Sequence, residues 1–104
     1  MPNLEKLAKT LEDVKRRKSM FFTPDAEAAM DFLTGFVLAA NASGAPVSWN
    51  SWRDALEHRG WQFDSLGFLP SMKARGLDDE EIADELINCL ADHLRRVSSS
   101  QSKE

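Results

Sequence analysis

The residues best suited to chemistry stand at helical spacing near the C-terminus. Glu85, Cys89 and His93 follow one another at intervals of four, so they share one side of a helix. A carboxylate, a thiolate and an imidazole are ligands that Zn²⁺ accepts. Cys89 and His93 also border the apolar stripe of that helix, however, and the second histidine, His58, stands alone in the sequence. We interpret the trio as a small buried thiol beside a border histidine, and we expect no metal site.

Catalytic side chains are equally sparse. The sequence contains two histidines, no tyrosine and no glycine-rich phosphate loop. A nucleophile needs a base and an orienting group beside it, and the spacing places no such set together. The acidic run from Asp78 to Glu81 is explained by helix capping. We therefore expect a protein that is not an enzyme and that carries no cofactor.

The tryptophans suggest a binding surface instead. Trp49 and Trp52 lie one helical turn apart, and Trp61 follows just past the end of the same helix. Such rings usually build a core, but they also dominate binding hot spots. The hypothesis is a docking patch for a protein partner made by Trp49, Trp52 and Arg53, and the alternative is that these rings are core. Leu38 is a further candidate contact, because it interrupts the narrow polar stripe of its own helix.

Basic residues support a second hypothesis. They form one dense run and one short pair, namely Lys15, Arg16, Arg17 and Lys18, then Arg95 and Arg96. On one face, both clusters could bind nucleic-acid phosphates with a strong salt dependence. A net charge of −4 gives no general attraction to nucleic acid. The stretch 74–86 is similar in rhythm to the first helix of a helix-turn-helix unit, but the helix continues past Leu86, where that unit needs a turn. Nucleic-acid association is therefore the alternative function.

These side chains must be positioned by helices, because apolar residues recur at helical spacing and no strand-like alternation occurs. The patterns predict helices over 3–19, about 24–42, 48–59 and 79–97, with a short broken helical segment near 64–75. Residues 24–42 are apolar nearly all round, which predicts the central buried helix, with Thr23 as its cap. Gly35 within it favours close approach of another helix. The fold class is a compact all-α bundle of about four main helices.

The ends of the chain are predicted to be less well packed. The amphipathic helix within residues 1–19 carries a short apolar stripe from Leu4 to Val14, and we expect it to attach loosely to a core domain of residues 20–97. That stripe could equally pair in a homodimer. Residues 98–104 are predicted to be a disordered tail, because they are polar and rich in serine.

Composition places the chain among small soluble proteins. Its 104 residues suit one domain, and its single cysteine cannot form an internal disulfide. No segment has the pattern of a signal peptide or a membrane anchor. We expect a cytoplasmic protein that does not associate with membranes. The predicted function is a small protein-binding module, such as an adaptor, an inhibitor or a regulatory subunit.

Overall fold

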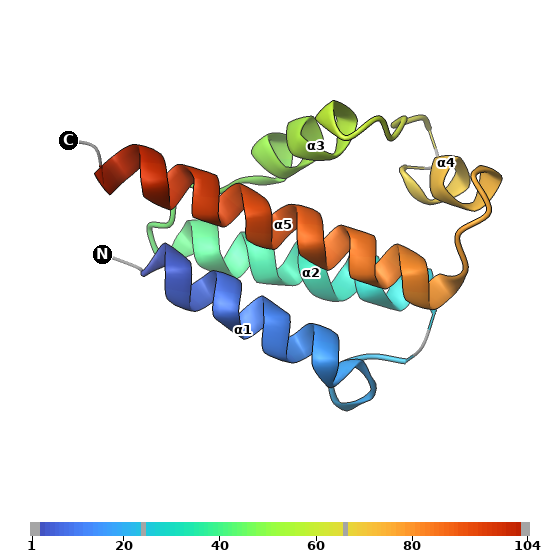
Figure 1. Cartoon of the computed structure of the whole chain (residues 1–104), viewed down its shortest axis with the longest axis horizontal. Helices are drawn as coiled ribbons and strands as arrows, with labels where there is room; N and C mark the ends of the chain where they lie inside the picture. The colour runs from blue at the N-terminus through green and yellow to red at the C-terminus, as the bar shows by residue number, and fades with distance from the viewer. Residues whose placement is uncertain (1–2, 24, 66, 103–104) are drawn as a thin grey trace.

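The computed structural model describes residues 3–23, 25–65 and 67–102, and these ranges contain helices joined by loops and turns (Figure 1). The predicted all-α bundle with four substantial helices is confirmed. The elements in chain order are α1 (Leu4–Arg16), the short 3₁₀ helix η1 (Lys18–Met20), α2 (Ala26–Ala42), α3 (Trp49–His58), α4 (Leu69–Ala74) and α5 (Asp79–Ser102).

Capping residues set most helix ends, as the sequence predicts. At the start of α5, the Glu81 N–H donates to Asp78 Oδ1 (2.8 Å) and the Asp78 N–H donates to Glu81 Oε1 (2.9 Å). At the end of α3, Gly60 adopts a φ of 96°, a conformation that favours glycine. This turn lets the N–H groups of Gly60 and Trp61 satisfy the last carbonyls of the helix.

The start of α2 differs from the expectation. The capping side chain is Asp25, which accepts a hydrogen bond from the Ala28 N–H at 2.7 Å. Thr23 does not cap the helix; its hydroxyl donates to the Asp25 carboxylate at 2.8 Å. Asp25 caps the helix in place of Thr23 because a carboxylate binds backbone N–H groups at the positive end of a helix more strongly than a hydroxyl does. Pro24, expected at the first helical position, lies outside the described residues.

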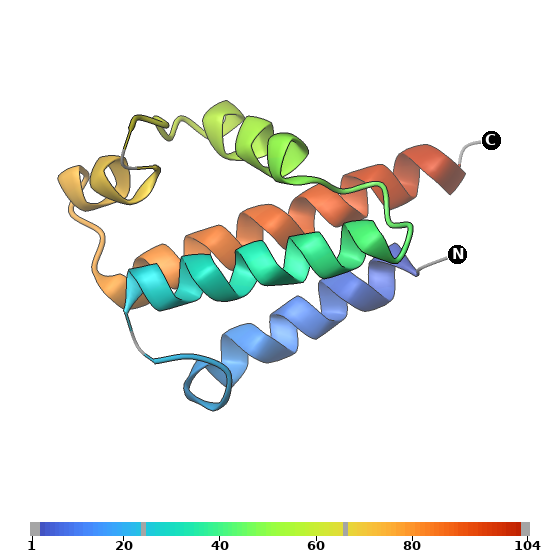
Figure 2. The ribbon, with the colours of Figure 1, turned by 180° about the vertical axis from the view of Figure 1, so that it is seen from behind.

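The helix with the most neighbours is α5 rather than α2. It packs against α1, α2, α3 and α4 (Figures 1 and 2). Its apolar residues from Ile82 to Leu94 are buried. By contrast, α2 buries one stripe of small and medium side chains, namely Ala26, Ala29, Leu33, Val37 and Ala40. Met30, Phe32 and Phe36 flank this stripe and are partly buried against the core, whereas Leu38 is 61% exposed.

The first helix packs tightly, which corrects the expected loose attachment. Its apolar stripe of Leu4, Ala8, Leu11 and Val14 is at most 4% exposed and forms part of the main core. Ion pairs reinforce the contact with α5: Lys18 Nζ lies 2.6 Å from Asp84, and Arg95 contacts Glu5 and Glu12 at 3.0 and 2.9 Å. Because this stripe is covered by α5, it does not offer a surface for a homodimer.

The C-terminal segment also differs from the expectation. Residues 98–102 continue α5 instead of forming a disordered tail, and 103–104 lie outside the described residues. Extending an existing helix adds one hydrogen bond for each residue that is fixed, whereas starting a helix is costly. A polar serine run can therefore continue a long packed helix.

Gly35 gives the first testable prediction. A Cβ built at this position meets no atom of the described residues within 4 Å. The close approach of another helix that the sequence suggested is therefore not found among them. Gly35→Ala should then raise the free energy of unfolding by about 0.5–1 kcal/mol, because alanine favours the helix over glycine. Urea denaturation of dilute protein measures this change. A loss of stability would show that the glycine is needed within the single chain.

Candidate functional site

An aromatic patch at the start of α3 is the candidate site. The Trp49 ring packs edge-on against Trp52 and Phe63, with centroids 5.7 and 6.0 Å apart. Phe63 also packs on the buried Phe68 at 5.1 Å. The guanidinium of Arg53 lies 5.8 Å from the centroid of the Phe63 ring. We call Trp49, Arg53 and Phe63 the Trp49 patch.

Local structure brings these three side chains together. A capping box between Ser48 and Ser51 fixes the first turn of α3, and Trp49 and Arg53 lie one turn apart along that helix. The left-handed turn at Gly60 then reverses the chain, so that the extended residues 61–63 return toward α3. Phe63 keeps 42% of its surface exposed, and Trp49 is half-buried.

The four residues predicted to form the partner site do not all lie there. Trp52 is fully buried, so it supports Trp49 from within the core and cannot contact a partner directly. Leu38 is 61% exposed, but it lies on α2, on the side opposite the buried stripe of that helix. Phe63 was missed as a patch residue, although the glycine turn before it is a signal that the chain doubles back.

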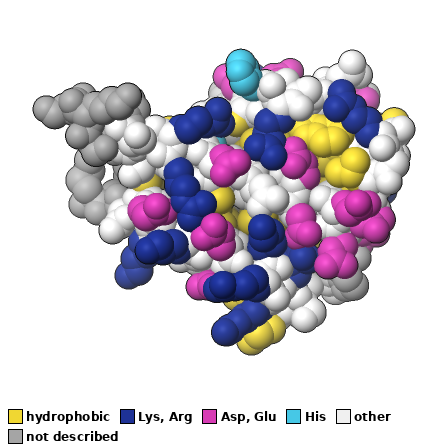
Figure 3. All heavy atoms as spheres, in the orientation of Figure 1, with side chains coloured by type: hydrophobic (Ala, Val, Ile, Leu, Met, Phe, Trp, Pro, Cys, Tyr) yellow, Lys and Arg dark blue, Asp and Glu magenta, His cyan; other side chains and the backbone are white. Residues whose placement is uncertain are grey.

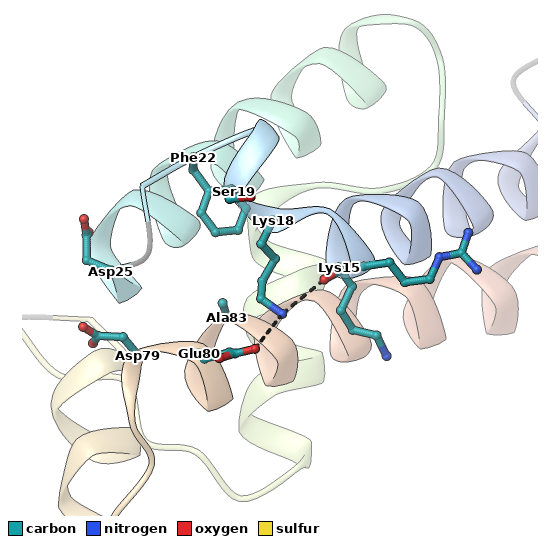
Figure 4. A pocket seen from close by; sticks show the side chains of 9 residues that line it. Lys15, Lys18, Ser19, Phe22, Asp25, Asp79, Glu80 and Ala83 are labelled. Carbon is teal, nitrogen blue, oxygen red and sulfur yellow. Dashed lines mark hydrogen bonds and ion pairs between the residues drawn. The ribbon is translucent and has the colours of Figure 1, made fainter.

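The basic run near the end of α1 is largely engaged within the chain. Lys18 extends toward α5 and contacts Asp84 and Glu80, and its ammonium also donates to the Lys15 carbonyl (Figure 4). The Lys15 ammonium donates to Asn88 at 3.0 Å, and Arg16 pairs with Asp13. Arg17 is exposed. These neighbours leave little uncompensated positive charge for a phosphate backbone.

A cavity of about 280 Å³ adjoins this run, between the ends of α1, α2 and α5. Its lining mixes both signs of charge around two apolar side chains, as Figure 4 shows. The residues are Lys15, Arg16, Lys18, Ser19, Phe22, Asp25, Asp79, Glu80 and Ala83. The three carboxylates disfavour an anionic ligand such as a phosphate.

The second basic cluster lies farther along α5. Arg95 is held by Glu5 and Glu12, and its hydrogen bond is the main reason that the pKa of Glu12 is lowered. Arg96 is exposed beside a shallow cleft that Arg59, Arg95 and Asp92 also line. Arg95 follows Asp84, the partner of Lys18, by eleven positions of helix, a distance of about 16 Å along the axis. On the face in Figure 3, basic and acidic side chains alternate.

A charged network joins α3 to α5 at Glu85. Its carboxylate accepts two hydrogen bonds from Arg59, at 2.8 and 2.9 Å, and one from Trp61 Nε1 at 2.7 Å. Burial raises the pKa of Glu85, but these hydrogen bonds and the charge of Arg59 outweigh burial and leave that pKa below its usual 4.5. Glu85 therefore serves as a structural anion and is not available as a proton donor near neutral pH.

The remaining members of the suggested metal trio have structural contacts as well. His93 Nε2 lies 3.1 Å from Ser51 Oγ, and burial together with Arg96 lowers the pKa of His93. Ser51 already hydrogen-bonds Ser48 in the α3 cap. Cys89 is buried without a disulfide. Over the described ranges, no three His, Cys, Asp or Glu side chains are grouped so that they could hold a metal ion.

Cys89 yields a second prediction. Burial raises the pKa of its thiol to about 11, so the reactive thiolate is scarce at neutral pH. We expect the native protein to resist a maleimide reagent at pH 7, and the urea-unfolded protein to react promptly. Mass spectrometry of the labelled chain measures both. Rapid labelling of the native protein would show that this side chain is open to solvent.

Comparisons with known proteins add no further constraint on the site. Neither the protein-family models, nor the curated proteins, nor the solved structures give a match to this chain. Among the described residues, none of the helices combines the length and the apolar character needed to cross a lipid bilayer.

Proposed function

We propose that this chain is a small non-enzymatic protein-binding module, acting as an adaptor, an inhibitor or a regulatory subunit, and that its partner docks on the Trp49 patch. The observation that carries the proposal is the exposed Phe63 ring, which is held in place by Trp49 and Phe68. A ring that is already ordered loses little entropy on binding, and aromatic residues with arginine dominate binding hot spots.

The patch also indicates the chemistry of the partner. Phe63 offers an apolar surface, and the Arg53 guanidinium beside it can donate hydrogen bonds. The only ion pair of Arg53 within the described residues is with Glu57, at 4.0 Å and on an exposed surface, which is weak. The partner segment should therefore carry an apolar side chain next to a carboxylate. A single buried cysteine suits the reducing cytoplasm as the place of this interaction.

Affinity capture from the native cell lysate tests the proposal, with three tagged chains compared by quantitative mass spectrometry. The wild-type chain should retain a stoichiometric partner, and Phe63→Ser should retain at least tenfold less of it. Leu38→Ser is the matched control, because it makes a similar exposed apolar-to-serine change away from the patch, on α2, and it should retain the partner. Equal capture by all three chains would contradict the role of the patch. Co-eluting nucleic acid released by moderate salt would favour the alternative function.

A further inference from the structure

We draw no further inference here: the strongest candidate, the cavity of about 280 Å³ between the ends of α1, α2 and α5, carries nothing, because its Lys18 ammonium is already bound to Asp84 and to the Lys15 carbonyl and its acids stand at the starts of two helices, with nothing among the described residues to show what would bind there.

Discussion

Leu11→Ala is expected to lower the free energy of unfolding by about 2–5 kcal/mol, because it opens a cavity in a packed core. Leu11 lies on α1 and is 0% exposed, within the same cluster as the buried residues of α5. A loss of this size is a large fraction of the about 5–15 kcal/mol that usually stabilises a domain. Urea denaturation of dilute protein measures it.

Leu38→Ala is the matched control, since it removes the same atoms from a side chain that is 61% exposed. It should change the free energy of unfolding by no more than about 0.5 kcal/mol. If Leu11→Ala behaved like this control, α1 would be loosely attached, as the sequence pattern suggests. That result would contradict the packing of α1 in the main core.

Glu85→Ala is expected to lower the free energy of unfolding by about 1–3 kcal/mol. The substitution removes the acceptor of three hydrogen bonds, two from Arg59 and one from Trp61. It leaves the Arg59 guanidinium with its longer contact to Asp92, at 3.3 Å, and the Trp61 N–H without this acceptor. The effect stays below that of a fully buried pair, because the Arg59 side chain is 33% exposed and water can replace part of the contact. Glu57→Ala breaks the exposed pair with Arg53 and should cost at most about 1 kcal/mol.

The same carboxylate predicts how stability depends on pH. The pKa of Glu85 is lower in the folded chain than its usual 4.5, so the unfolded chain binds a proton first as the pH falls. Its contribution is fully present above pH 4.5 and is lost as the pH falls through the lower folded value. Glu85→Gln should therefore show a shallower loss of stability below pH 4.5 than the wild type. Equal slopes for the two chains would contradict this role.

Local signals predicted the helices well, because capping and termination depend on near neighbours in the sequence. The Asp78–Glu81 capping box occurs as predicted, and the helix predicted over 48–59 ends at His58, just before the glycine turn at Gly60. The packing of the helices against one another could not be predicted from such local signals. The apolar residues of α2 could not reveal which stripe the chain covers, because that depends on how α5, far along the sequence, packs against it.

Long-range ion pairs explain why the sequence does not predict the tight packing of α1. Its apolar stripe from Leu4 to Val14 is short, and the expectation from the sequence is a loose attachment to the core. In the fold, Lys18 reaches Asp84 and Glu80, and Arg95 reaches back to Glu5. These pairs join residues more than sixty positions apart, and no local pattern shows them.

The candidate site was predicted in part. Trp49 and Arg53, which the sequence places in the docking patch, do lie together there beside Phe63, whereas Trp52 is fully buried. Phe63 belongs to the Trp49 patch because the chain reverses at Gly60. Leu38 lies away from the patch because of the way α2 is oriented. Both follow from tertiary packing rather than from spacing in the sequence.

Photo-crosslinking in living cells tests the central claim most directly. A photoreactive phenylalanine analogue at position 63 should give one discrete adduct with another protein, because the patch contacts its partner there. The same analogue in place of Lys9, which is exposed on α1, should give none. The absence of an adduct at position 63, in cells where the chain is present and folded, would contradict the claim that the Trp49 patch is a protein-binding site.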